Sequence, residues 1–171
     1  MAVRRGNVRE MRNTVTVRPA AASDAAWIAH VLADSWGDVV VVAHGTAYQA
    51  LDLPALIAER DGAQVGLLTY TLTGDGLEVV SLDATVPRAG VGTALLAAAV
   101  DLGRERGAGR LWLVTTNDNL DALRFYQRRG LRISAVAPGA VDAARALKPG
   151  IPLIGDHGIP IRDELTLEIA L

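Results

Sequence analysis

The stretch LEVVSLDATVPRAGVGTALL, residues 77–96, predicts a β-strand that runs through a glycine-bearing turn directly into an apolar helix. Gly90 and Gly92 lack a Cβ atom, so the backbone N–H groups of this turn can approach an anion closely. The positive end of a helix that starts near Thr93 also favours an anion. Glycines between a strand and a helix are ordinary turn residues as well. The turn alone therefore leaves two interpretations open, a phosphate-binding loop and a plain connection.

Length and composition predict one folded unit. The chain has 171 residues, half of them hydrophobic, which suits one core and is short for two domains. We expect a single α/β domain over residues 14–171, preceded by a flexible tail over residues 1–13. A net charge of −2 provides no general attraction for nucleic acid, so we expect no nucleic-acid partner and a solvated tail. The tail is locally basic through Arg4, Arg5, Arg9 and Arg12.

Residue usage argues against several classes of site. No run of about eighteen uncharged apolar residues occurs, and no hydrophobic segment follows the charged start. We therefore expect neither a membrane span nor a signal peptide, and a cytoplasmic location. The lack of cysteine excludes disulfides, thiolate metal ligands and a cysteine nucleophile. His30, His44 and His157 do not have metal-ligand spacing, so no metal site is expected.

The first half of the chain predicts a strand, a helix and a meander. Alternation over residues 14–18 predicts a short strand, and Ser23 or Asp24 is expected to cap the helix that follows. Residues 39–42 are either a strand or a buried loop, because so short an apolar run has no decisive period. The Asp-Gly pair at residues 61–62 predicts a type I′ turn between two strands, and a further turn leads into the strand of the opening stretch.

The second half predicts helices that alternate with strands. The helix after the glycine turn is expected to end at Gly107. Further elements are expected as a strand over residues 110–116, a helix from Asp118 or Asn119 to about Arg129, a strand over 131–137, a helix over 141–147 and a last strand over 162–171. Because this order mixes meander strands with strand-helix-strand units, we predict a mixed sheet with helices on both faces.

A second motif lies in the helix predicted to begin near Asn119. Asn119, Ala122 and Tyr126 share one face of that helix, at positions i, i+3 and i+7. Together with the glycine turn, this motif resembles those of the GNAT acetyltransferase family.

The two family motifs are matched with two departures. The glycine-rich motif, [Q/R]xxGxG/A followed by a small residue and leucines, is matched by residues 90–96. Pro87 occupies its first position, and Arg88 follows one place late. The signature NxxAxxFYxxxGF is matched except at its last position, which is Leu131. The C-terminal segments KPGIP and GIPIRDEL are also similar to those of an uncharacterised bacterial subgroup of the family.

The resemblance covers the chain from Val15 to Leu171 and implies the GNAT fold. This fold is a mixed, mostly antiparallel sheet of roughly six to seven strands with helices on both faces. The strand over residues 78–84 would splay from the strand RLWLVTT and open a cleft for acetyl-CoA. The contacts to coenzyme A that the resemblance implies are Leu82, Asp83, Ala84, Arg88, Ala89, Gly90, Val91, Gly92, Thr93, Ala94, Asn119, Ala122, Phe125 and Tyr126.

Each part of this set has an implied task. The backbone at Leu82 and Ala84 would pair with the pantetheine arm like an added strand, and the amides of residues 88–94 would hold the pyrophosphate. Asn119 would bond the pantetheine arm, while Ala122 would leave room for it. Two alternatives stay open, since asparagine is also a good N-cap and an aromatic residue at helical spacing is often a core residue.

The chemistry needs two proton movements. An ammonium group must lose a proton before its nitrogen attacks a thioester, and the departing thiolate is best protonated. In the family, a tyrosine at the position of Tyr126 lies near the thioester sulfur, which makes Tyr126 the candidate general acid. Glu78 is the candidate base, acting directly or through water. The alternatives are a packed phenol and an ordinary exposed glutamate.

The acceptor is expected to be a primary amine of a small molecule. The candidate acceptor residues are Trp36, His44, Tyr70 and Asp163, together with the loop over residues 148–162. Arginines 124, 128, 129 and 132 either meet the phosphates of the cofactor or solvate their helix. Alternative functions are a non-catalytic acyl-CoA sensor, a protein-amine acetyltransferase and an interaction protein with an empty turn. The resemblance also makes a homodimer an expectation.

Overall fold

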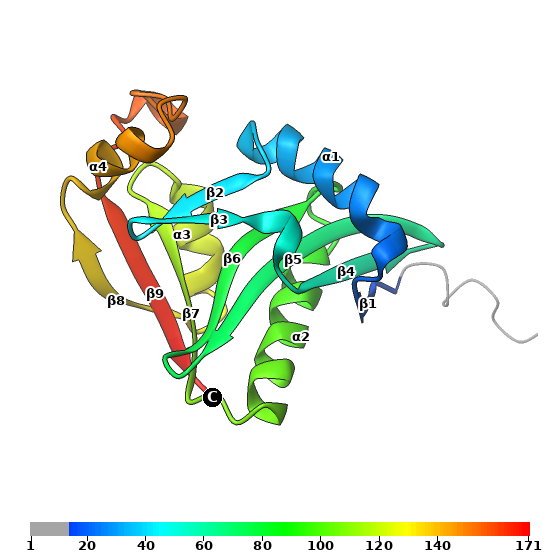
Figure 1. Cartoon of the computed structure of the whole chain (residues 1–171). Helices are drawn as coiled ribbons and strands as arrows, with labels where there is room; N and C mark the ends of the chain where they lie inside the picture. Colours follow the sequence, from blue (N-terminus) through cyan, green and yellow to red (C-terminus); the bar gives the residue numbers. More distant parts are fainter. Residues whose placement is uncertain (1–13) are drawn as a thin grey trace, which may run out of the picture.

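The computed structural model describes residues 14–171, and the predicted tail over residues 1–13 lies outside the described residues. A seven-stranded sheet in the order β1-β4-β5-β6-β7-β9-β8 forms its centre, and β2 and β3 form a separate two-stranded sheet (Figure 1). The strands are β1 (Thr16–Pro19), β2 (Val40–Ala43), β3 (Thr46–Gln49), β4 (Ala55–Arg60), β5 (Ala63–Thr73), β6 (Gly76–Ala84), β7 (Arg110–Thr116), β8 (Arg132–Ala137) and β9 (Glu164–Ala170). Of the neighbouring pairs in the large sheet, β6 and β7 are parallel and the others are antiparallel, so the predicted mixed, mostly antiparallel sheet is confirmed.

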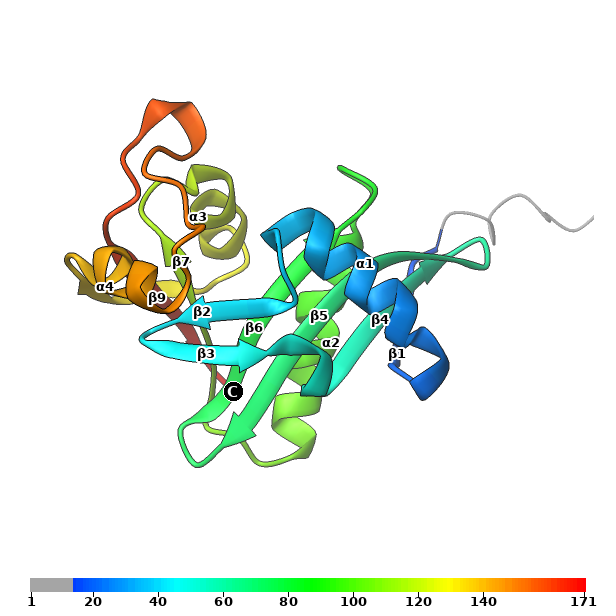
Figure 2. The same cartoon turned by 45° about the horizontal axis from the view of Figure 1, so that its top comes forward.

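Two helices cover opposite faces of the large sheet. The helices are α1 (Ala25–Trp36), α2 (Val91–Glu105), α3 (Leu120–Gln127) and α4 (Ala140–Leu147), with short 3₁₀ turns at Ala22–Asp24, Ala50–Asp52 and Asp156–Gly158. Figure 2 shows α1 and the β2–β3 hairpin in front of the sheet and α2 behind it. On the α1 face, Leu32 packs with buried side chains such as Ile57, and on the α2 face Leu95 packs with others such as Leu68. None of the helices in residues 14–171 has the length and apolar character needed to cross a membrane.

The predicted β4–β5 hairpin is present, and the structure contains a second hairpin that was not predicted. Asp61 and Gly62 have φ angles of 53° and 80°, as the predicted turn between β4 and β5 requires. His44 and Gly45 have φ angles of 41° and 78° and join β2 to β3. The apolar run over residues 39–42 is therefore a strand rather than a buried loop.

Two local predictions were wrong in detail. Asp24 precedes α1, but its carboxylate accepts from Arg18, the backbone N–H of Ala21 and Gln64 rather than capping the helix. The guanidinium of Arg18 holds the pKa of Asp24 down to about 2. In addition, α2 starts at Val91 rather than near Thr93, because Gly90 in the left-handed conformation allows the helix to begin directly after it.

The sheet opens between β6 and β7. These strands pair only from Leu77–Leu111 to Val79–Leu113, so the splay begins after Val79 and not already at Glu78. On its other side β6 has an irregular register, with Ser81 opposite Thr69 and Val79 opposite Tyr70. The extra residue strengthens the local bend of β6. A cleft therefore opens where the carboxyl end of β6 leaves β7.

Candidate active site

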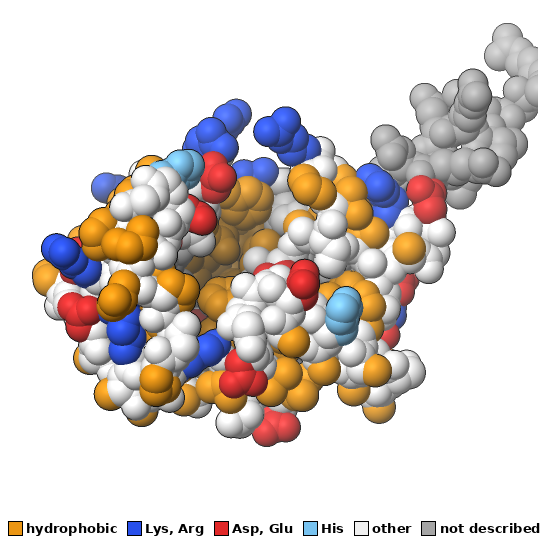
Figure 3. Space-filling model, turned by 90° about the horizontal axis from the view of Figure 1, so that it is seen from above, with side chains coloured by type: hydrophobic (Ala, Val, Ile, Leu, Met, Phe, Trp, Pro, Cys, Tyr) orange, Lys and Arg blue, Asp and Glu red, His pale blue; other side chains and the backbone are white. Residues whose placement is uncertain are grey.

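A groove of about 840 Å³ runs between the start of α2 and α3. Figure 3 shows the hollow from above, with hydrophobic side chains on its floor and Lys or Arg side chains at its rim. The end of β6, the glycine turn and one face of α3 line it. The lining includes twelve of the predicted cofactor contacts, Leu82, Ala84, Arg88, Ala89, Gly90, Val91, Gly92, Thr93, Asn119, Ala122, Phe125 and Tyr126.

The glycine turn presents free backbone donors to this groove. Gly90 has a φ of 75° and precedes α2, and the N–H of Ala94 donates to the carbonyl of Gly90. The amides of the first helical turn before Ala94 have no acceptor within the helix. Gly92 allows α3 to approach, since a Cβ there would lie 3.1 Å from the Phe125 ring. This arrangement suits an anion next to a closely packed aromatic ring.

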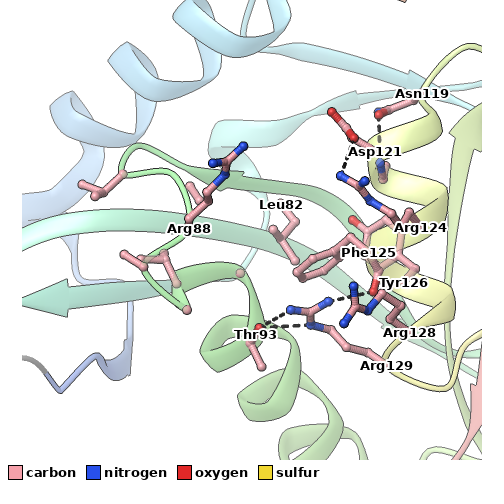
Figure 4. Close-up of a pocket in the computed structure, with 17 residues that line it drawn as sticks. Leu82, Arg88, Thr93, Asn119, Asp121, Arg124, Phe125, Tyr126, Arg128 and Arg129 are labelled. Atoms are coloured by element: carbon pink, nitrogen blue, oxygen red, sulfur yellow. Dashed lines mark hydrogen bonds and ion pairs between the residues drawn. The ribbon is translucent and has the colours of Figure 1, made fainter.

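Arginine side chains surround the groove. Arg88 lies on the glycine-turn side, and Arg124, Arg128 and Arg129 extend from α3 and the turn directly after it (Figure 4). Arg132 lies on β8 and does not line the groove. Of the four arginines predicted to act together, only Arg124, Arg128 and Arg129 therefore line it.

Arg129 ties α3 to the start of α2. Its guanidinium donates to Thr93 Oγ1 over 2.5 and 3.0 Å and lies 3.6 Å from the centre of the Phe125 ring. Burial lowers the pKa of Arg129, and the charge of neighbouring Arg128 lowers it further. The two walls of the groove are thus linked through side chains that also line it.

Asn119 both caps α3 and lines the groove. Its Oδ1 accepts from the N–H of Ala122 over 3.1 Å, so it is the N-cap of α3. The same residue lines the groove, and the small side chain of Ala122 lies beside it.

The splay of β6 from β7 contains a smaller cavity of about 90 Å³. Tyr126, Asn119 and Ala122 line both this cavity and the groove, and Trp36 closes the cavity from the end of α1. Trp36 Nε1 donates to both oxygens of Asp83, over 3.2 and 3.1 Å. Burial raises the pKa of Asp83, and the bond from Trp36 partly offsets that rise.

Tyr126 lies where the groove and the small cavity meet. It is 9% exposed, and burial raises the pKa of its phenol, with a further contribution from the charge of Asp83. Its hydroxyl therefore keeps its proton at neutral pH.

Glu78 is buried at the closed end of the splay. Its side chain is only 5% exposed, so the alternative of an ordinary exposed glutamate does not apply. His44 Nε2 lies 2.7 Å from Glu78 Oε1, the Tyr48 hydroxyl donates to Oε2 over 2.9 Å, and Thr71 Oγ1 donates over 3.4 Å. Burial and the charge of Glu78 raise the pKa of Tyr48, so this phenol stays a donor.

His44 connects the β2–β3 hairpin to two strands of the large sheet. Besides its ring contact with Glu78 on β6, its backbone N–H donates to Glu164 Oε2 on β9 over 3.0 Å. Burial raises the pKa of Glu164, and the bond from His44 partly offsets this. The His44 ring also lies 5.3 Å from the Trp112 ring of β7, whose Nε1 is buried without a partner in residues 14–171.

The predicted acceptor residues are not all in one place. Trp36 lines the small cavity and His44 meets Glu78, as described. Tyr70 packs against the α2-side core, because the register of β5 turns it to the face opposite His44. The carboxylate of Asp163 accepts from the N–H of Gly139 and holds the start of α4. Tyr70 and Asp163 are therefore separated from the Glu78 cluster.

Sequence reasoning missed Tyr48 and Trp112. The alternation of residues 46–49 after the His44-Gly45 pair could have revealed a second hairpin, with residues 44 and 48 close together. For Trp112 no such signal was present, because its place beside Glu78 follows from the pairing of β6 with β7.

Comparison with known proteins agrees with this arrangement. The model of the Acetyltransferase (GNAT) family matches residues 26–131. The protein YxbD of Bacillus subtilis is 44% identical over 133 residues, which cover 77% of this chain and 84% of that protein. Streptothricin acetyltransferase of Streptomyces lavendulae is 32% identical over 107 residues, 61% of this chain and 53% of that protein.

A solved structure shares the fold. The Bacillus subtilis acetyltransferase in complex with CoA has a TM-score of 0.73 at 19% identity, covering 92% of this chain and 99% of that one. The family match spans α1 to the end of α3 and so includes both the glycine turn and the Asn119 motif. The chain belongs to the GNAT family of acetyltransferases.

Proposed function

We propose that the protein transfers the acetyl group of acetyl-CoA directly to the primary amine of a small molecule. The observation that carries this proposal is that the arginine-lined groove and the small cavity share lining residues, Tyr126 among them. The groove end suits the phosphates of coenzyme A, and the cavity end suits the reacting thioester.

The groove fits the cofactor in charge and in backbone geometry. The free amides before Ala94 and the arginines of α3 would bind phosphate oxygens. Beyond Val79, the edge of β6 that faces β7 has no strand partner, so the backbone at Leu82 and Ala84 is available to amides of the pantetheine arm. Asp83 contributes backbone only, since its carboxylate is bonded to Trp36. The acetyltransferase structures solved with CoA or acetyl-CoA support this assignment.

Acetyl-CoA supplies an activated acetyl thioester when it is bound. The residues of the chain supply the proton movements. The base function lies in the cluster formed by Glu78 and the side chains bonded to it. The Tyr126 hydroxyl holds a proton where a departing thiolate would receive it.

A small-molecule acceptor suits the enclosed surroundings of Glu78. The β2–β3 hairpin covers this carboxylate through His44 and Tyr48, which leaves little room for an extended peptide. The relative named streptothricin acetyltransferase also supports this size class, since its name specifies a compound. We further propose a homodimer, formed at the edge strand β8, where Ile133 and Val136 are exposed.

The proposal is tested by measuring CoA release from acetyl-CoA with a panel of small primary amines and a lysine-containing peptide. We expect turnover with at least one small amine and acetylated product of the corresponding mass. Saturable acetyl-CoA binding by calorimetry, with no turnover of any amine, would instead establish a sensor module. Turnover of the peptide alone would establish a protein-amine enzyme.

A further inference from the structure

The cluster around Glu78 is organised as a buried carboxylate that holds an exposed imidazole. Glu78 is 5% exposed and accepts bonds from three side chains, whereas the side chain of His44 is 33% exposed. An ionised carboxylate can only accept hydrogen bonds. A neutral His44 that bonds an ionised Glu78 through this 2.7 Å contact carries its proton on Nε2 and has a lone pair on Nδ1.

We propose that His44 is the catalytic base, which accepts the proton of the acceptor ammonium at Nδ1, and that Glu78 is its positioning residue. This inference rests on the proposed acetyltransferase function and identifies the atom that acts within the Glu78 cluster. The buried carboxylate fixes the Nε2–H tautomer and stabilises the imidazolium that forms. In residues 14–171, Nδ1 forms no side-chain or backbone hydrogen bond that would block this role.

The proton account is simple. A proton leaves the ammonium nitrogen and forms a bond to Nδ1, while the freed nitrogen lone pair becomes the nucleophile. Glu78 keeps its bond from Nε2–H. The imidazolium later returns the proton to solvent, which reaches the part-exposed ring directly. No further reactant is needed.

The position of His44 suits this task. Glu78 pairs with Trp112, and the next pair, Val79 with Leu113, is the last before the strands separate. Val79 and Leu113 also line the small cavity. Glu78 is the residue before Val79 on β6, so the Glu78–His44 pair lies at the closed end of the splay, on the α1 face of the sheet, although neither residue lines the small cavity.

The backbone at His44 shows that the ring is held in place. Its φ of 41° lies in the left-handed region, which glycine or asparagine adopts more readily than histidine in a turn of this kind. The contacts that hold this conformation are the bond from the backbone N–H to Glu164 and the ring contacts with Glu78 and Tyr48. A histidine in this backbone conformation is consistent with a functional role for its side chain.

Acidic groups lie near the His44 ring and its backbone. Glu78 on β6 and Glu164 on β9 are acidic neighbours, and Tyr48 on β3 is a neutral donor. Arg110 lies 5.3 Å from the centre of the Trp112 ring, and Lys148 after α4 donates to the carbonyl of Val40 at the start of β2. Glu78 and Tyr48 contact the His44 ring, and Glu164 accepts from its backbone N–H, so the charged groups in direct contact with His44 are both carboxylates.

The first test uses His44→Ala and His44→Gln, with the exposed His30→Ala on α1 as the matched control. The glutamine amide can still donate to Glu78 but has no titratable nitrogen, so this variant keeps the hairpin in place. We expect kcat to fall about 10²-fold or more in both, with the KM for acetyl-CoA little changed. Added imidazole should restore activity to His44→Ala in proportion to its neutral fraction. His30→Ala should behave as the unmodified protein.

The second test separates positioning from proton transfer. In Glu78→Gln, the pH profile of kcat/KM should change, because the imidazolium loses its anionic partner. With only three histidines in the chain, ¹⁵N NMR can follow His44 directly, and we expect the Nε2–H tautomer in the unmodified protein and its loss in Glu78→Gln.

The outcomes distinguish this inference from the proposed function. If the unmodified protein turns over no amine, the proposed function fails. If it turns over an amine and folded His44→Gln retains its kcat and pH profile, His44 is not the base and only the inference fails. A His44→Ala variant that imidazole does not rescue, together with an Nδ1–H tautomer in the unmodified protein, would also overturn it.

Discussion

Tyr126 shows how one residue acquires a chemical role from its surroundings. A phenol in water has a pKa near 10, and both burial and the charge of Asp83 raise the pKa of Tyr126. Because the hydroxyl keeps its proton through the neutral range, it can donate that proton without first being protonated. It also lines both the groove and the small cavity, which is where the proposed mechanism needs a proton donor.

Replacing Tyr126 by phenylalanine removes the hydroxyl group and its proton but keeps the packing of the ring. We expect kcat to fall about 10²-fold, with the Kd for CoA changed less than about threefold, because the ring still fills its place. Steady-state kinetics and calorimetry measure the two quantities. The unmodified enzyme should show no loss of rate from Tyr126 ionisation below about pH 10. An unchanged kcat in the phenylalanine variant would remove Tyr126 from the mechanism.

The contact of α2 with β5 is the element-scale feature that positions the anion-binding turn. Gly66 on β5 lies directly under the first turn of α2, and a Cβ there would lie 2.3 Å from Val91 Cγ1 and 3.0 Å from Leu95. Val91 and Leu95 are fully buried, and a branched valine side chain has one strongly preferred rotamer in a helix. The helix start can approach the sheet closely only because residue 66 is glycine.

Gly66→Ala should therefore disturb the start of α2. We expect a loss of about 1–3 kcal/mol in the free energy of unfolding, typical of an overpacked core, and weaker CoA binding because the turn amides shift with the helix. Gly74→Ala is the matched control, since a Cβ there meets nothing within 4 Å. Denaturant unfolding and calorimetry check both effects. Equal stability and equal CoA affinity of the two variants would contradict this account of the contact.

The C-terminal loop is another element whose path depends on distant side chains. Asn117 Oδ1 accepts from the backbone at Arg162 and Asp163, and Asp118 Oδ2 accepts from the N–H of Asp156. Lys148 Nζ donates to the carbonyls of Trp36 and Val40, each over 2.9 Å. The single lysine of the chain thus joins α1 and β2 to the loop, and both bonds would be weakened by acetylation of its amine.

At the scale of the whole molecule, the groove joins elements from distant parts of the chain into one basic surface. Arg88 comes from the turn before α2, Arg124 from α3, and Arg128 and Arg129 from the turn directly after α3. Their summed charge faces the groove although the net charge of the chain is −2. Local charge rather than net charge therefore decides which ligand is attracted.

This arrangement predicts salt-sensitive binding of CoA. CoA at about 100 times its Kd should stabilise the fold by about 2.7 kcal/mol, seen as a rise in Tm. The Kd for CoA should increase with added NaCl, whereas that of pantetheine, which lacks the pyrophosphate, should not. Arg128→Gln should weaken CoA binding about tenfold, and Arg132→Gln on β8, outside the groove, should leave it unchanged. Equal affinities of the two arginine variants would contradict a phosphate site formed by α3.

The sequence by itself determined the features that depend on neighbouring residues. Asp61-Gly62 specified the hairpin turn, Gly90 the entry into α2, and Asn119 the cap of α3. These signals act through backbone sterics and local hydrogen bonds, so a single sequence contains them. The two motifs of the cofactor groove were readable for the same reason.

Tertiary structure alone decided which distant residues meet. His44 reaches Glu78 across 34 positions and Glu164 across 120, because the β2–β3 hairpin crosses a sheet in which β6, β7 and β9 are neighbours. Tyr70 lies on the α2 face with Leu68 by the alternation of β5, but only the pairing of β5 with β6 puts Glu78 and its partners on the opposite face. Strand order and register are set by the packing of the whole chain, and so they decided the acceptor side of the site.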